Sequence, residues 1–304
     1  YSGALGGPIL RDKLWFFTSL QYIKSISDEP TWYFPYDWEG WQGLAKLTWQ
    51  LSDANRLIGK YSTDPADIPG VNAGITYTDS AKATQEQGGD IWQFELNSVL
   101  SESWLLNVQL GTSNGFLKRY STDQPDTVSG HYNDSTLLWY NAYPYNNSDK
   151  RPRDEVRANA SWFVDELLGS HEFKGGLEYS EMAFDSGSYY PGGAIFYDND
   201  GNASSSWTPR DLNGDGFFNN YIEVKIPEET AKQSVRTSAE LYTVFLQDSW
   251  RIHPNLTLKP GVRLDKTLMY NALDAEISDM ERWQPRVGAA WDIQGNGRHV
   301  VRLS

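Results

Sequence analysis

The residues best suited to bind a ligand lie in a loop-like stretch, RDLNGDGFFNNYIE, between residues 210 and 223. Oxygen-bearing side chains recur there at alternate positions with a glycine after the third, in the order Asp211, Asn213, Asp215, Gly216 and Asn219. Hard oxygen ligands with this spacing can converge on one Ca²⁺, and glycine permits the sharp bend. The pattern therefore predicts a calcium site within the long loop from 184 to 237.

The match to a calcium-binding loop is incomplete at its last position. A bidentate glutamate is expected there, but the position holds Ile222, and Glu223 comes one residue late. Asp198 and Asp200 add carboxylates shortly before the loop. An ordinary turn rich in Asp, Asn and Gly explains the same residues. Bound calcium and a plain turn both remain open, and no other cofactor is expected.

No set of residues indicates an enzyme. GTSNG resembles a nucleophile elbow around Ser113, but that motif needs a strand, a sharp turn and a helix, whereas this string ends a predicted strand. The chain has no cysteine, and its four histidines are scattered without metal-pair spacing. We therefore expect no catalytic residue and no enzymatic activity.

Aromatic residues in the predicted loops are the other candidates for ligand binding. Aromatic rings can stack on sugars or clamp a peptide, although packing of the loops on one another explains them as well. The candidates are Trp32, Trp139, Tyr140 and Trp207. Ligand identity is not predictable from these residues.

The overall charge excludes one class of partner. The 304 residues include 40 acidic and 26 basic residues, which gives a net charge of -14. A phosphate backbone would be repelled, so nucleic acid is not an expected partner. The mean hydropathy of -0.58 and the lack of any long apolar run argue against membrane-spanning helices. Alternating barrel strands keep a similarly low average, so they remain compatible with this composition.

Long strands are expected to position the candidate residues, and the clearest one belongs to a predicted hairpin from about 238 to 271. Its second arm alternates for about sixteen residues, with one apolar parity and one polar parity. The apolar residues are Leu256, Leu258, Val262, Leu264, Leu268 and Tyr270, and the polar ones include Thr257, Lys259, Arg263, Asp265 and Thr267. Strands of soluble sandwiches are usually about five or six residues long, whereas a tilted strand needs about nine to eleven to cross a bilayer. The length indicates lipid on one face and water on the other.

The same alternation recurs along the chain. Further strands are expected at about 12–23, 41–51, 56–63, 92–100, 104–111, 153–165, 171–183, 283–293 and 298–304. Short connections near residues 53, 102, 167, 254 and 296 alternate with longer ones near 32, 76, 134, 210 and 277. Outer-membrane barrels have this rhythm of short periplasmic turns and long external loops. The sequence thus predicts an all-β, antiparallel up-and-down transmembrane β-barrel with about eleven strands. A soluble β-rich carbohydrate-binding protein is the alternative.

An odd number of strands has a consequence for closure. Bacterial single-chain barrels use even numbers, because the first and last strands otherwise meet in parallel. We therefore expect about half of a larger barrel, with residues 12–304 in the wall and residues 1–11 in a connection that precedes it.

Three stretches resemble one family. LGGPILRDKLWFFTSLQY, VFLQDSWRIHPNLTLKPGVRLD and WQPRVGAAWDIQGNGRHVVRLS are similar to the plug-to-barrel segment and two barrel hairpins of TonB-dependent outer-membrane receptors of the Oar-like group. The resemblance implies a barrel of about twenty-two strands, closed by an N-terminal plug and energised by the TonB complex. Within the motif, Asp248, Trp250, Gly261 and Arg263 match the family pattern and are assigned structural roles.

The resemblance implies a function as well as a fold. We expect a TonB-dependent transporter in the outer membrane of a Gram-negative bacterium, taking up a scarce small molecule, glycan or peptide through the barrel lumen. The expected partners are outer-membrane lipid, the ligand and the TonB complex, the last through a plug that this sequence lacks. A passive porin-type channel or a surface adhesin on the same wall stays an alternative.

Overall fold

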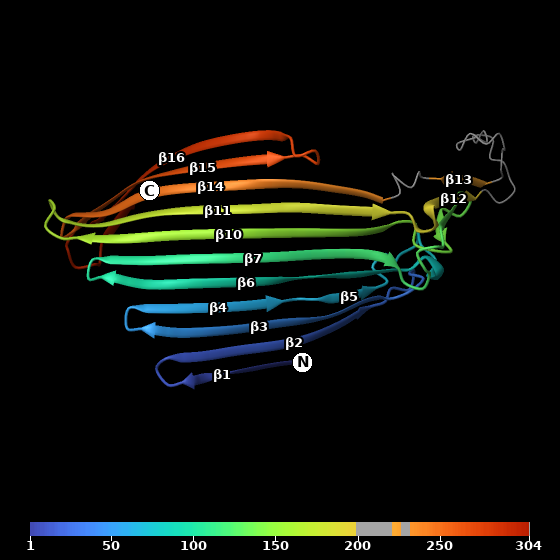
Figure 1. Ribbon diagram of the computed structural model, residues 1–304, viewed down its shortest axis with the longest axis horizontal. Coiled ribbons are helices and arrows are strands. Elements are labelled where there is room, and N and C mark those ends of the chain that lie inside the picture. Colours follow the sequence, from blue (N-terminus) through green and yellow to red (C-terminus); the bar gives the residue numbers. More distant parts are fainter. Residues whose placement is uncertain (199–220, 226–231, 304) are drawn as a thin grey trace.

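The computed structural model describes residues 1–198, 221–225 and 232–303, and most of this part of the chain forms one antiparallel sheet of thirteen strands (Figure 1). The strands on its main path are β1 (Ser2–Leu10), β2 (Leu14–Ser27), β3 (Tyr36–Ser52), β4 (Asn55–Thr63), β6 (Ala83–Ser101), β7 (Trp104–Ser121), β10 (Asn146–Val164), β11 (Ser170–Tyr189), β14 (Lys232–His253), β15 (Leu256–Tyr270), β16 (Glu276–Asp292) and β17 (Val300–Leu303). Strands that follow one another on this path pair side by side, which confirms the predicted up-and-down order. The short strand β5 (Ala66–Pro69) pairs with β3 and β6.

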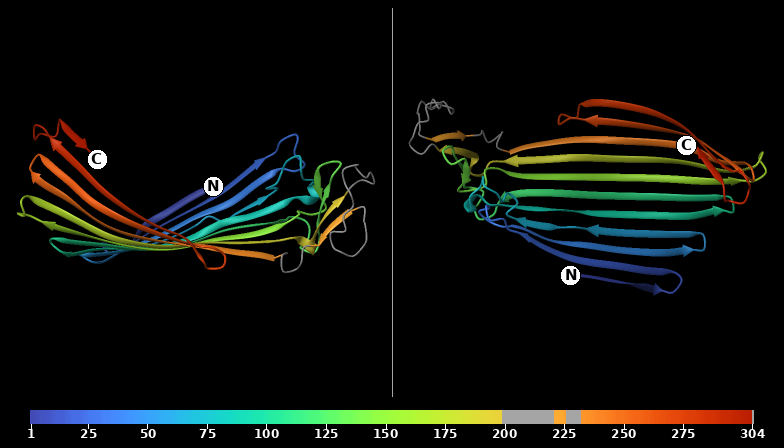
Figure 2. Two further views of the ribbon diagram at one scale, coloured as in Figure 1. Left: turned by 90° about the horizontal axis from the view of Figure 1, so that it is seen from above. Right: turned by 180° about the vertical axis from the view of Figure 1, so that it is seen from behind.

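The sheet bends into an open trough, with β1 and β17 at its two edges (Figure 2). Short turns connect the strands at one end, and the long connections gather at the other (Figure 1). We call these the turn end and the loop end. The alternation of short and long connections predicted from the sequence is confirmed from β2 to β15. It is wrong for the last pair: β16 begins at Glu276, so the connection expected to be long near residue 277 covers only residues 271–275, whereas the turn after β16 covers residues 293–299. Among the described residues, no helix is both long enough and apolar enough to cross a membrane.

The main path contains twelve strands rather than the eleven expected, because Ser2–Leu10 is itself a strand. It pairs with β2 from Ser2 opposite Gln21 to Leu10 opposite Leu14. Its glycines and Pro8 give no alternating apolar pattern, so the sequence shows no strand signal there. Proline lacks the amide proton that an inner strand needs, and an edge strand tolerates it. The segment expected to lead into the barrel is thus already part of the sheet.

Several strands extend further toward the loop end than the sequence suggested. β11 continues to Tyr189 and β14 begins at Lys232, although the whole stretch from 184 to 237 was expected to be a loop. These extensions pair polar residues, for example Asp185 with Arg236. Polar residues form the same backbone hydrogen bonds between strands as apolar residues do. The alternating apolar pattern therefore predicts only the part of a strand that carries apolar side chains, and not its full length.

The loop end carries the buried core. A second sheet forms there from β9 (Leu138–Tyr140), β8 (Gly130–Asn133), β12 (Ala194–Asp198) and β13 (Tyr221–Lys225), with β12 and β8 parallel. Two short 3₁₀ turns, η1 (Asp79–Ala81) and η2 (Pro191–Gly193), accompany it. The buried apolar residues of this region are Phe34, Ala66, Ile68, Ala81, Ala83, Ala142 and Tyr143. Apolar side chains are therefore buried mainly at the loop end.

The turn between β10 and β11 requires a glycine at position 169. Gly169 has φ +116°, and a Cβ there would lie 2.3 Å from the carbonyl oxygen of Arg251. We expect Gly169→Ala to lower the free energy of unfolding by about 1–3 kcal/mol, because both the backbone and its neighbour must shift. Urea titration of the refolded protein in detergent micelles measures this. A Cβ on Gly7 would meet nothing within 4 Å, so Gly7→Ala is the control, and an equal loss in both variants would contradict the explanation.

Candidate functional site

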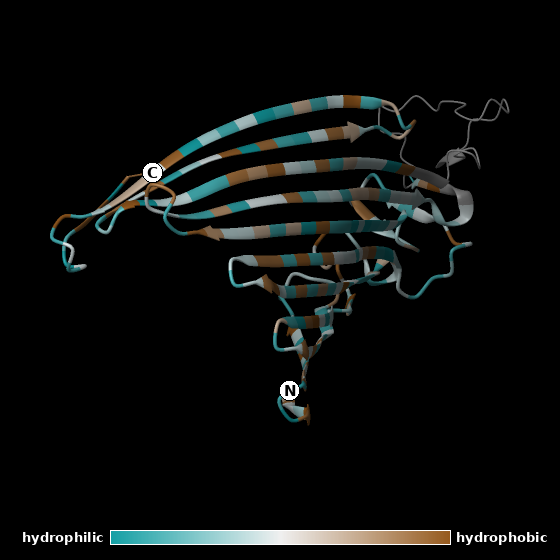
Figure 3. Ribbon diagram, turned by 60° about the vertical axis from the view of Figure 1, so that its left-hand side comes forward, coloured by the Kyte–Doolittle hydropathy of each residue, from teal (hydrophilic) through white to brown (hydrophobic). Residues whose placement is uncertain are grey.

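The apolar side chains at alternate positions of the main-sheet strands point outward and are exposed. Brown and teal alternate along the strands in Figure 3, as the sequence predicts. Val287 is 71% exposed and Leu246 57% exposed, and Trp49 and Trp283 are exposed on the same face. Among the residues that the structure describes, no second sheet covers these side chains, because the four-stranded sheet and the buried apolar residues lie at the loop end. A soluble sandwich would bury them, so the face fits lipid.

Two belts of aromatic rings bound this apolar face. At the turn end Trp104 stacks on Trp162 at 5.5 Å, and the row continues through Phe173 and His171 to Trp250. Toward the loop end the pairs are Tyr22 with Trp41, Tyr61 with Trp92, and Tyr179 with Tyr242. On β14, Trp250 and Tyr242 mark the two belts, and a strand between them covers roughly 26 Å at about 3.3 Å per residue. This span suits the hydrocarbon layer of a bilayer, with interfacial aromatic girdles on either side.

The residues of the family motif hold the turn-end belt in place. Asp248 Oδ2 lies 2.6 Å from Nδ1 of His171, whose Nε2 faces the Leu167 carbonyl oxygen at 2.8 Å. Trp250 Nε1 donates to the carbonyl oxygen of Leu168 at 3.0 Å. Asp248 and Trp250 therefore tie the β10–β11 turn to β14, which agrees with the structural roles assigned to them from the sequence.

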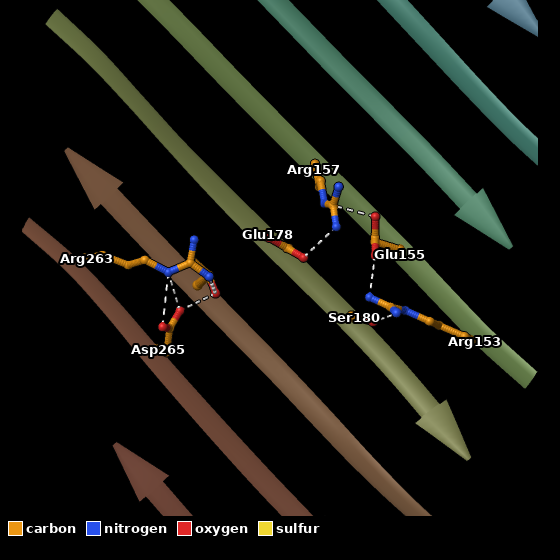
Figure 4. Close-up of polar contacts among 8 residues, drawn as sticks. Arg153, Glu155, Arg157, Glu178, Ser180, Arg263 and Asp265 are labelled. Carbon is orange, nitrogen blue, oxygen red and sulfur yellow. Dashed lines mark hydrogen bonds and ion pairs between the residues drawn. The ribbon is translucent and has the colours of Figure 1, made fainter. Parts of the chain in front are cut away.

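The opposite, concave face carries a ladder of paired charges across β10 and β11 (Figure 4). Arg153 Nη2 lies 2.6 Å from Glu155 Oε2, and Arg157 Nε lies 2.9 Å from Glu155 Oε1. Arg157 also reaches Glu178 Oε1 at 3.1 Å, and Arg153 Nε donates to Ser180 Oγ at 3.1 Å. Each charge thus has a partner of opposite sign on its own or the adjacent strand.

The ladder continues on β14, β15 and β16 around Asp265. Arg263 Nε donates to Asp265 Oδ1 at 2.8 Å, Thr243 Oγ1 donates to the same oxygen at 2.6 Å, and Gln284 Nε2 donates to Oδ2 at 2.5 Å. Thr243 is only 2% exposed. It lies opposite Glu178 in the register, so it links the contacts around Asp265 to those on β10 and β11. Arg263 and Asp265 share the polar parity, as the sequence predicts. We call the set Arg153, Glu155, Arg157, Glu178, Ser180, Thr243, Arg263, Asp265 and Gln284 the luminal ladder.

The luminal ladder forms a polar and electrically balanced wall. Its arginines and carboxylates engage one another at hydrogen-bond distance, so no carboxylate in it is free to act as a general base. Toward the turn end the same face holds a hollow of about 720 Å³ lined mainly by polar side chains such as Arg56, Asn107 and Lys174. There Glu95 Oε1 accepts from Asn97 at 2.9 Å and from Asn107 at 3.0 Å. The arrangement suits a water-filled passage or a polar interface rather than chemistry.

Two of the aromatic candidates pack inside the loop-end cluster. Trp139 stacks on Tyr77 at 6.5 Å and contacts Tyr132 and Tyr197. The Tyr140 hydroxyl donates to Asp198 Oδ2. These contacts favour packing of the loops over an open ligand platform for Trp139 and Tyr140. Trp32 is half-buried and lies in the β2–β3 loop, far from Trp139 and Tyr140 in the sequence. Its backbone amide donates to the carbonyl oxygen of Glu29.

The calcium prediction is not tested by the structure. Asp211, Asn213, Asp215 and Asn219, and also the aromatic candidate Trp207, lie outside the described residues. Glu223 falls in β13. Asp198, which was expected to add a carboxylate, instead lies 2.9 Å from His131 Nδ1 and accepts from Tyr140.

Burial raises the pKa of two tyrosines at the loop end. Burial raises the pKa of Tyr120 to about 12, and its hydroxyl donates to Glu86 at 2.7 Å. Burial also raises the pKa of Tyr143, which is 1% exposed. A tyrosine hydroxyl is protonated at neutral pH even when it is exposed, so the raised pKa moves deprotonation of both residues further into the alkaline range.

Sequence reasoning did not find most of the luminal ladder. Glu155, Glu178 and Thr243 each fall on a polar parity, and nothing in one strand shows which residue of another strand stands opposite. The available signal is charge: strands that become neighbours carry arginine and glutamate on the parity facing away from lipid. Arg263 and Asp265 were visible because they lie two residues apart on one strand.

Comparisons with known proteins agree with this geometry. Residues 35–281 match the outer membrane beta barrel domain family. The TonB-dependent transporter Oar of Myxococcus xanthus is 32% identical over 155 residues, which are 49% of this chain and 14% of that protein. The outer membrane transporter YddB of Escherichia coli has a TM-score of 0.68 at 16% identity, covering 97% of this chain and 36% of that one. The pyoverdine receptor FpvA of Pseudomonas aeruginosa PAO1 has a TM-score of 0.64 at 15% identity, covering 96% and 42%. The chain thus spans well under half the length of each of these proteins.

Proposed function

The chain belongs to the outer membrane beta barrel domain family, and from this premise we propose that it forms part of the barrel wall of a TonB-dependent transporter. Its place is the outer membrane of a Gram-negative bacterium. In the proposed function, the loop end captures a scarce ligand outside the cell, and the ligand then passes along the concave face. No chemical change of the ligand is part of the proposal.

One observation carries the proposal. The main sheet exposes apolar side chains between two aromatic belts on its convex face and presents paired charges on its concave face. A wall with lipid on one side and water on the other divides two compartments, so a solute can cross only along the inner face. The similarity to a TonB-dependent transporter favours energised uptake over passive flow. Small molecules, glycans and peptides all remain candidate ligands.

Growth of a deletion strain on defined iron and carbon sources tests the function. We expect the strain to lose growth on one scarce source, and the restored gene to rescue growth only where TonB is present. A passive porin-type channel would rescue growth without TonB. An adhesin would leave growth on every source unchanged, and either result would overturn the proposal.

A further inference from the structure

We propose that the convex face holds an acyl chain of a phospholipid in a hollow over β10 and β11, beside the turn-end belt. The inference goes beyond the proposed function, because it concerns the lipid around the wall and neither the transported ligand nor TonB. The hollow has a volume of about 590 Å³, and most of its lining residues lie on the apolar parity that faces outward. Its floor consists of Ala158 and Ala160 on β10 and Gly175 on β11.

The register explains why the convex face is hollow at this place. Ala160 and Gly175 stand opposite each other, and the strands beside them place Leu106 of β7 and Leu246 of β14 on the same row. The two small residues are half-buried, whereas Leu246 is 57% exposed. Two neighbouring strands therefore lack large side chains where the flanking strands carry leucine. Because neighbouring strands lie about 4.8 Å apart, the gap has the width of a hydrocarbon chain.

A glycine on this face does not always leave a hollow. Gly59 of β4 lies opposite Phe94 of β6, and a Cβ on Gly59 would meet the ring of Phe94 at 3.6 Å. Among the described residues, a Cβ on Gly175 would meet within 4 Å just the Phe245 carbonyl oxygen at 3.6 Å and Leu246 Cδ1 at 3.7 Å. No ring of this part of the chain fills the space above Gly175, so that space is left for a group from outside it.

The depth of the hollow indicates a lipid chain as its occupant. Ala160 and Gly175 lie two residues from Trp162 and Phe173 of the turn-end belt, which is roughly 7 Å at about 3.3 Å per residue. Aromatic belts mark the membrane interface, so the hollow lies in the hydrocarbon just inside it. Short turns of outer-membrane barrels face the periplasm. The lipid therefore belongs to the periplasmic leaflet.

The turn-end belt offers donors for the polar end of the same lipid. Trp104 and Trp162 line the hollow and stack on each other at 5.5 Å. In the described part of the chain neither indole N–H has a hydrogen-bond partner, whereas Trp250 Nε1 donates to the carbonyl oxygen of Leu168. An indole N–H at the membrane interface can donate to an ester or phosphate oxygen of a lipid.

A protein partner fits the hollow less well than a lipid does. Stable protein interfaces bury about 800 Å² on each partner and surround an apolar centre with a polar rim. The rim here is apolar and continuous with the lipid-facing surface, as Leu106, Leu177 and Val244 show. Small residues let an acyl chain approach the backbone closely, and dispersion contacts supply the attraction where no water is displaced.

Retention of a phospholipid tests the hollow. The whole protein in detergent is incubated with palmitoyl-oleoyl-phosphatidylethanolamine and washed, and native mass spectrometry detects the lipid that stays bound. We expect the double variant Ala160→Leu/Gly175→Leu to retain this lipid about fivefold less than the wild type, because the leucines fill the hollow. Gly175 does not have a positive φ, so its backbone accepts leucine. Trp104→Phe/Trp162→Phe should also weaken retention, since it removes both indole donors and keeps two stacking rings.

The control is Ala45→Leu, which adds the same side chain at an exposed position of the convex face on β3, far from the hollow in the strand order. It should retain the phospholipid as the wild type does, and heat-modifiable migration on gels checks that all variants are folded.

Equal retention in the wild type and in Ala160→Leu/Gly175→Leu would overturn the proposal. So would bound lipopolysaccharide that the phospholipid does not displace, since the hollow would then face the other leaflet. A double variant that turns a dimer into a monomer with unchanged lipid content would also overturn it, because a second copy of the chain would then cover the hollow. The measurement needs neither TonB nor uptake, so its outcome is separate from that of the growth test.

Discussion

Arginine in place of Leu246 is expected to lower the free energy of unfolding in a bilayer by about 2–4 kcal/mol. Leu246 lies on the convex face of β14, midway between the belt residues Trp250 and Tyr242. A guanidinium at that depth cannot keep its water, and the nearest headgroups are half a bilayer away. Unfolding and refolding in lipid vesicles, followed by tryptophan fluorescence in urea, measures the change.

The matched control is Gln109→Arg on the concave face. Gln109 lies on β7 at a similar distance from its turn, opposite Glu95 and Arg157 in the register. An arginine there stays in water, with the carboxylate of Glu95 on one side and the guanidinium of Arg157 on the other; the attraction and the repulsion oppose each other, so a change of less than about 0.5 kcal/mol is expected. If the two variants lost equal stability, or if Gln109→Arg lost more, the assignment of lipid and water to the two faces would be wrong.

The two faces could be predicted from the sequence because the signal is local. Val262 and Arg263 are neighbours in the chain, and their side chains must point to opposite sides of one strand. Repeated over a whole strand, this fixes which parity meets lipid. The turns could also be predicted from neighbouring residues. For example, Ser52 and Asp53 are polar turn residues that follow one apolar run and precede the next. The short and long connections followed from the spacing of the strands.

What the sequence left open depends on contacts between distant segments. Tyr140 and Asp198 are 58 residues apart, and only the parallel pairing of β8 with β12 brings their loops together. The contacts that Trp139 and Tyr140 make within the loop end could therefore be seen only with the structure in hand. The strand β1 was missed for a different reason: its glycines have no side chains to show a parity, so only pairing with β2 reveals it.

The luminal ladder yields the second large expected effect, because Glu155 holds two arginines at once. Its side chain is 21% exposed, and its oxygens lie 2.6 Å from Arg153 and 2.9 Å from Arg157. Removing one partner of a buried pair costs about 3–5 kcal/mol, and water in the lumen screens part of this. We expect Glu155→Ala to lower the free energy of unfolding by about 1–3 kcal/mol in urea titration. Two neighbouring arginines left without their shared carboxylate repel each other and produce the loss.

A pair with ordinary exposure separates this effect from the loss of any carboxylate. Asp279 lies 3.2 Å from Lys266, and their side chains are 45% and 41% exposed, so Asp279→Ala should cost at most about 0.5 kcal/mol. The double variant Glu155→Ala/Arg153→Ala should recover part of the stability lost in Glu155→Ala, since it removes the arginine that loses its carboxylate partner, whereas Arg157 keeps Glu178. If instead the losses from the two single substitutions simply added, Glu155 and Arg153 would act independently. The concave face would then be a set of separate polar residues rather than one connected wall.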